Sequence, residues 1–254
     1  MQNPPSTIDE VLHRLDQIID ETIQANNYLG IFAYVYRRTT AQIKQAISEN
    51  RFEDNEQMEK FDVIFANRYI DAYEKFKTQQ DIPKSWSTAF LAKNQPLTII
   101  QHLVMGMNAH ISFDLGLAAE AIAPKNQIDD LKNDFIIVNH ILQTIINEMQ
   151  ERIGKVSRLM FLLDWVGEKS DEKIINFGIV NARQFAWQFA LGLSAIDGIA
   201  KDALIEQTDL TVSRLNQLVQ SPSSRILNYT LRLISFFEVK NIEKIINHLR
   251  DDVG

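Results

Sequence analysis

The residues best suited to chemistry lie in one long apolar segment, 96–124, which contains two histidines and an aspartate. His102, Gly106, His110 and Asp114 follow one another at intervals of four. In a helix this spacing places them on one face, with a drift of about 40° per step. His110 and Asp114 lie one turn apart, so they can bind one metal ion together or form a hydrogen bond that fixes the imidazole tautomer.

The other two members of this row have different roles. His102 would lie about 12 Å from His110 along the helix axis, too far for easy ligation of the same ion. Gly106 lowers helix propensity by roughly 1 kcal/mol relative to alanine, so its position indicates that another backbone or a ligand approaches there. Close packing of a neighbouring helix explains it equally well.

A metal site on His110 and Asp114 would need further ligands from other helices. The candidates are Asp134, His140 and Asp164, and Asp134 is the best of them because it begins the segment DFIIVN on the next expected helix. One divalent ion, zinc, manganese or iron, would then support metal-assisted hydrolysis. The structural alternative is a satisfied buried His110–Asp114 pair, with Asp134 as a carboxylate favoured by the helix dipole.

Arg183 and Trp187 lie one turn apart on another expected helix. The guanidinium of Arg183 can stack on the indole of Trp187 or neutralise Asp114 or Asp134. A network made only of protein groups would be structural. An arginine that points into a wet cavity would instead bind a carboxylate or phosphate of a substrate.

Three segments resemble a bacterial family of all-helical proteins known only as a domain of unknown function. They are HLVMGMNAHISFDL from His102, DFIIVN from Asp134 and ARQFAW from Ala182. The resemblance extends from about Phe65 to Leu191 and implies no established activity. It implies that one set of residues belongs together: His102, Asn108, His110, Asp114, Asp134, Asn139, Arg183 and Trp187. We place His102, Asn108, Asn139 and Trp187 around the site, either as pocket residues or as residues that contact the site residues from behind.

The His-x-x-x-Asp element is also similar to one in the zinc-dependent phospholipases C and P1-type nucleases, which are all-helical. Those proteins carry more histidines, a second such element and an N-terminal tryptophan ligand, whereas this chain begins Met1-Gln2. The similarity therefore implies at most a reduced metal site.

The elements that must position these residues are helices. Apolar residues recur every three or four positions through long runs, and the 254 residues include only nine glycines and six prolines. The pattern predicts one all-α domain, a bundle of about nine or ten helices, that spans residues 1–254 with a flexible tail at 1–6. Expected helices include 96–124, 128–153 and 156–165, and Asp54 with Gln57 is typical of a capping pair.

Composition excludes several classes of function. The net charge of -7 argues against binding nucleic acid, and no window approaches the roughly 18 apolar residues of a membrane span. The chain contains no cysteine, which rules out thiol chemistry and cysteine-ligated metals. We expect a cytoplasmic protein, and the sequence does not indicate an oligomeric state.

These observations favour a soluble helical protein with an interior polar site, acting either as a metal-assisted hydrolase or by binding a small molecule. The alternative is a non-enzymatic interaction protein in which the His–Asp–Arg network is purely structural.

Overall fold

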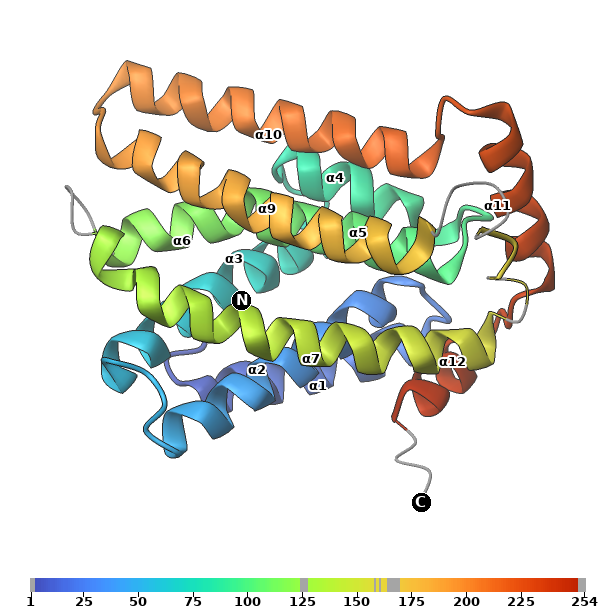
Figure 1. Ribbon diagram of the computed structural model, residues 1–254, viewed down its shortest axis with the longest axis horizontal. Coiled ribbons are helices and arrows are strands. Elements are labelled where there is room, and N and C mark those ends of the chain that lie inside the picture. Colours follow the sequence, from blue (N-terminus) through green and yellow to red (C-terminus); the bar gives the residue numbers. More distant parts are fainter. Residues whose placement is uncertain (1–2, 124–127, 158, 160, 164–169, 251–254) are drawn as a thin grey trace.

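Most of the long helices run along the longest dimension of the molecule (Figure 1). The computed structural model describes residues 3–123, 128–157, 159, 161–163 and 170–250, and their side chains apart from those of 129, 130, 146, 150 and 170–180. The helices in the first half are α1 (Ile8–Gln24), α2 (Leu29–Ser48), α3 (Asn55–Lys77), α4 (Lys84–Leu91), α5 (Ile99–Ala109) and α6 (Leu115–Ile122). Those in the second half are α7 (Lys132–Val156), α9 (Ser170–Ser194), α10 (Ile199–Gln220), α11 (Arg225–Phe237) and α12 (Ile242–Arg250).

A π-helical turn, His110–Asp114, joins α5 to α6, and we call the continuous helix Ile99–Ile122 the central rod. With the rod counted once, the described residues form ten helices and no strand. The predicted all-α bundle is therefore confirmed. The main core contains buried side chains from every α-helix except α10, whose buried Val212 lies in a second, smaller cluster with Phe113, Leu117, Phe189 and Leu193.

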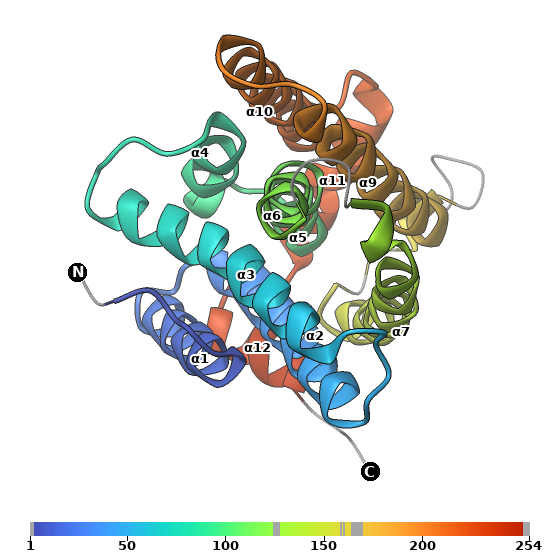
Figure 2. The same cartoon turned by 90° about the vertical axis from the view of Figure 1, so that its left-hand side faces the viewer.

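The central rod lies in the middle of the bundle. Viewed end-on, it is surrounded by α2 and α3 on one side, α4 and α10 on another, and α9 and α7 on the remaining side (Figure 2). Most of its side chains are buried, including all five residues of the π turn. This position explains why a segment with almost no charged residue is stable as a helix.

The rod begins at a capping box. The Thr98 hydroxyl accepts from the Gln101 N–H, and the Gln101 side chain accepts from the Thr98 N–H. Buried Glu238, at the end of α11, accepts a further hydrogen bond from the Ile99 N–H at 2.9 Å. The expected start at Pro96 is therefore wrong by three residues, because the cap at Thr98 satisfies the first free N–H groups and the helix begins at Ile99.

The last described helix is anchored in the core. Ile242, Ile245, Ile246 and Leu249 of α12 are fully buried. The carbonyl oxygen of Leu249 accepts from the hydroxyl of Tyr34 on α2 and from the guanidinium of Arg152 on α7. These contacts connect the C-terminal helix to two helices far away in the sequence.

Other expectations about the elements had mixed outcomes. Asp54 caps α3 by accepting from the Gln57 N–H, as its spacing predicted. The tail expected at 1–6 is held in part, since Asn67 donates to the carbonyl oxygen of Pro5. Helix α7 continues to Val156, and residues 158, 160, 164 and 165 of the helix expected at 156–165 lie outside the described residues.

Gly106 marks a close approach between the central rod and α2. A β-carbon at this position would lie 2.6 Å from Cγ of Phe32. The ring base cannot move away easily, because Phe32 also packs against Tyr69 and Trp86. Close helix packing therefore accounts for this glycine.

Replacing Gly106 by alanine is expected to lower the free energy of unfolding by about 2 kcal/mol, because overpacking outweighs the better helix propensity of alanine. Urea denaturation measures the change. The matched control is Gly154→Ala on α7, where a β-carbon would meet nothing within 4 Å. The control should gain up to about 1 kcal/mol. Equal gains at both positions would contradict the packing argument.

Candidate functional site

His110, Asp114 and Trp86 form a hydrogen-bonded unit at the π turn. His110 Nδ1 lies 3.0 Å from Oδ2 of Asp114, and the indole Nε1–H of Trp86 donates to the same oxygen at 2.8 Å. The Trp86 N–H donor favours the ionised form of Asp114, and an ionised carboxylate only accepts, so the imidazole proton of His110 lies on Nδ1. The other ring nitrogen, Nε2, is then free to accept.

Aromatic rings fix the orientation of the His110 imidazole. Phe65 stacks on it with a centroid distance of 3.7 Å and an interplanar angle of 7°, and Tyr36 meets it edge-on at 4.4 Å. Burial lowers the pKa of His110 and raises the pKa of Asp114. The imidazole is therefore neutral at neutral pH, held between rings that leave it little freedom.

The π turn begins at His110 and ends at Asp114, so it sets the position of these two residues relative to one another. The Leu115 N–H donates to the carbonyl oxygen of His110, five residues back, instead of four. Such turns are rare and are frequent at functional sites. The extra residue rotates the side chains that follow it about the helix axis. The row of residues at intervals of four that was predicted for a regular helix therefore ends at Asp114.

Asp134 is not part of this unit. Its Oδ1 accepts from the Glu53 N–H at 2.9 Å, which ties the start of α7 to the loop before α3. Among the described residues, no group of three or more His, Asp or Glu side chains is arranged to hold a metal ion. The predicted ligand set of His110, Asp114 and Asp134 is therefore not assembled. His140 is exposed, and Asp164 lies outside the described residues.

Arg183 on α9 contacts neither Asp114 nor Trp187 in the ways predicted. Its guanidinium lies over the ring of Phe135, with Cζ 4.0 Å from the centroid, and one nitrogen donates to the carbonyl oxygen of Phe135 at 3.0 Å. Trp187 packs against the same ring at 5.1 Å. Burial lowers the pKa of Arg183 to about 9. The side chain is thus a buried cation at neutral pH.

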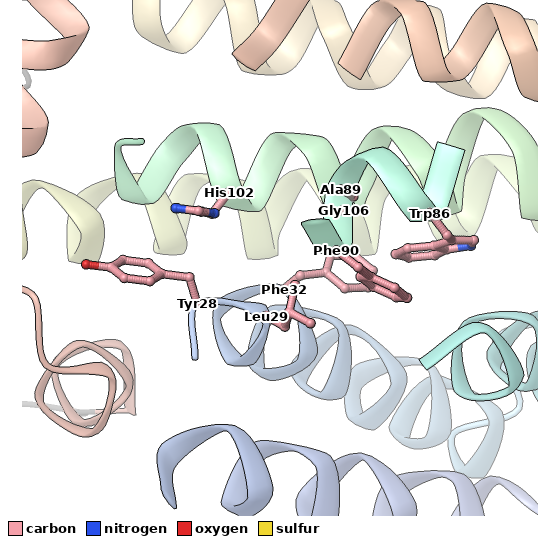
Figure 3. A pocket seen from close by; sticks show the side chains of 8 residues that line it. All are labelled: Tyr28, Leu29, Phe32, Trp86, Ala89, Phe90, His102 and Gly106. Carbon is pink, nitrogen blue, oxygen red and sulfur yellow. The ribbon is translucent and has the colours of Figure 1, made fainter. Parts of the chain in front are cut away.

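His102 lies in a different part of the molecule, as the spacing predicted. Its ring stacks on Tyr28 at 4.5 Å, beside a cavity of about 10 Å³ that also touches Gly106 and Trp86 (Figure 3). Burial lowers the pKa of His102 to about 4. This cavity is large enough for no more than about one water molecule.

The two predicted asparagines do not reach the His110–Asp114–Trp86 unit. Asn108 donates to Asn216 and to the carbonyl oxygen of Val212, so it joins the central rod to α10. Asn139 is exposed on α7. Asn108 is therefore a structural link between helices. The prediction of Asn139 as a residue of an interior pocket is wrong, because its side chain is exposed.

A larger cavity of about 60 Å³ lies between the central rod and helices α2, α3, α7 and α9. We call it the interior cavity. Its lining is mainly aliphatic and aromatic, and includes Val35, Ile43, Phe61, Phe65, Val138, Leu142 and Ile145. Apart from Tyr36, its ionisable lining residues are Asp62, His110 and Arg183. Only two of these three belong to the predicted set.

Asp62 was not expected from the sequence. It is 1% exposed, and burial, aided by the nearby charge of Glu59, raises its pKa to about 7. The signal was present in the spacing. Asp62 lies four residues after Met58 and four before Ala66, both buried, so it shares their inward face.

Comparison with known proteins places the chain in a family. A model of DUF5995, described as a family of unknown function, matches residues 8–222. The chain belongs to this family. The DUF5995 match covers α1 to α10 and includes every candidate residue named above. No curated protein and no solved structure matches the chain.

The DUF5995 match confirms the resemblance to a family of unknown function. The comparisons give no support for similarity to zinc-dependent phospholipases C or P1-type nucleases. Within the described part of this DUF5995 protein, no helix is both long and apolar enough to span a bilayer.

Proposed function

We propose that this protein binds a small, largely apolar organic molecule in the interior cavity. One observation carries the proposal. Asp62, His110 and Arg183 all line this cavity, and each keeps a buried polar atom without a hydrogen-bond partner among the described residues: Oδ2, Nε2 and Nε, respectively. An apolar cavity with a few converging polar groups is the usual form of a small-molecule site.

The unpaired atoms are energetically expensive. A buried donor or acceptor without a partner costs roughly 1–3 kcal/mol. Of the ten such atoms among the described residues, four line this one cavity, because the hydroxyl of Tyr36 is also unpaired there, whereas buried polar groups in folded proteins are nearly always hydrogen-bonded. A bound molecule would provide the missing hydrogen-bond partners, and water would provide them when the molecule is absent.

Small alcohols and aromatic alcohols should raise the melting temperature, and Val138→Phe should remove this effect. The added ring would fill space lined by Val138. A ligand at one hundred times its dissociation constant stabilises a folded protein by about 2.7 kcal/mol, so a thermal-shift assay detects binding readily.

The control variant is Ile136→Phe. Ile136 lies two residues away on α7 but is 47% exposed and does not line the cavity. It should respond to ligands as the parent does. If Val138→Phe and Ile136→Phe respond equally, the ligands bind elsewhere and the proposal fails.

Metal-assisted hydrolysis has less support. The predicted donors are engaged with protein groups: Asp114 by His110 and Trp86, and Asp134 by Glu53. We therefore propose binding without assigning a reaction. The hydrogen bonds of Asp114 favour the structural role considered for it from the sequence. A cytoplasmic location and the absence of a nucleic-acid partner stay predictions from composition.

A further inference from the structure

Arg183 is the only cationic side chain among the described residues that line the interior cavity. It is 5% exposed, and it forms no ion pair with any described residue. Its contacts are the ring and the carbonyl oxygen of Phe135. Burial is the only cause of its lowered pKa, so no acidic group among the described side chains offsets its charge.

A buried cation without a counter-ion is unfavourable in an apolar interior. Stacking on Phe135 and one carbonyl acceptor offset part of this cost. The Nε–H remains without an acceptor. An anion with an oxygen that accepts from this N–H would supply both the acceptor and the opposite charge.

We infer that the ligand of the interior cavity is a monocarboxylic acid, bound as its anion with the carboxylate against Arg183 and its apolar body among the aliphatic side chains. The inference rests on the proposed function and names the chemical class of its ligand. An arginine fork matches a carboxylate well, since two N–H groups can donate to its two oxygens.

The rest of the lining limits the charge of the ligand. A phosphate monoester carries between about −1.5 and −2 charges at neutral pH, which one guanidinium does not balance. Asp62 also lines the cavity and would repel a second negative charge whenever it is ionised. The remaining lining residues, such as Val35, Ile43, Leu142 and Ile145, offer apolar contacts and no further cation.

The test compares matched ligands that differ only in the charged group. Butanoate, hexanoate, octanoate and benzoate are titrated into the full chain by calorimetry, together with the corresponding primary alcohols. Because a hydrogen bond to a charged group contributes more than a neutral one, at least one acid should bind about tenfold more tightly than its alcohol. An alkyl phosphate serves as the dianionic comparison and should bind more weakly than the acid.

Arg183→Met should remove the preference for the acid, so that an acid and its alcohol bind this variant with similar affinity. Arg183→Lys keeps the charge without the fork and should retain part of the preference. The control is Arg225→Met, which removes an exposed charge on α11 and should behave as the parent. If Arg183→Met does not fold, as judged by circular dichroism, the parent and Arg183→Lys decide the question.

The outcomes separate this inference from the function on which it rests. If alcohols bind as tightly as acids to the parent, the carboxylate assignment is overturned while binding in the cavity stands. Tighter binding of the alkyl phosphate also overturns it. If neither acids nor alcohols bind, the proposed function and the inference fall together.

Discussion

Replacing Asp114 by alanine should lower the free energy of unfolding by about 3 kcal/mol, because it leaves two buried N–H donors without an acceptor. Those donors are Nε1 of Trp86 and Nδ1 of His110, both bonded to the same carboxylate oxygen. Trp86 is fully buried and His110 is 2% exposed, so water cannot replace the lost acceptor without disturbing the core. Urea denaturation measures the loss as a lower midpoint.

Two further variants test whether the loss of stability comes from these buried hydrogen bonds. Asp20→Ala removes an exposed carboxylate on α1 and should change stability by less than about 0.5 kcal/mol. A double-mutant cycle of Asp114→Ala with Trp86→Phe isolates the energy of the hydrogen bond between them. If Asp114→Ala is as stable as the parent, the unit is not structural, and a functional role for the His110–Asp114 pair becomes the better interpretation.

Replacing Asp62 by asparagine should stabilise the protein by an amount that grows with pH. The pKa of Asp62 is raised to about 7 in the folded protein from 3.8, so the folded state holds a proton that the unfolded chain releases. Stability from this proton is complete below the lower value and is lost as pH rises towards the higher one. At about 1.4 kcal/mol per pKa unit, the difference between variant and parent reaches at most about 4 kcal/mol above neutral pH.

The measurement is a set of urea denaturation curves for Asp62→Asn and the parent between about pH 4 and pH 8. All other titrating groups occur in both proteins, so their contributions cancel in the difference. Asp20→Asn is the control for removing a carboxylate from an exposed site. A difference between Asp62→Asn and the parent that does not change with pH would contradict the assignment of Asp62 as a buried, protonated acid.

Much of the fold could be predicted because the necessary information is local. Helix periodicity depends on residues three and four apart, and capping depends on a few neighbours, so Asp54 and Gln57 were identified correctly. The His110–Asp114 hydrogen bond follows in the same way from their separation of four. The distance of His102 from this pair required only the rise of a helix.

The partners across helices could not be predicted, because they depend on how the helices pack. Trp86 reaches Asp114 from α4, and Glu53 donates to Asp134 from the loop before α3. Arg183 meets Phe135 instead of an acid for the same reason. The π turn adds a second difficulty, since it changes the helix register in a segment whose composition gives no sign of it.

Glu238, at the end of α11, connects the C-terminal part of the chain to the start of the central rod. The family match ends at residue 222, yet Glu238 caps Ile99 and accepts a second hydrogen bond from the hydroxyl of Ser157 at 2.6 Å. A chain cut at 222 would lose this cap and also the four buried side chains of α12. The packed core therefore extends beyond the residues that the family model matches, and variants of the candidate residues are best compared in chains that retain both C-terminal helices.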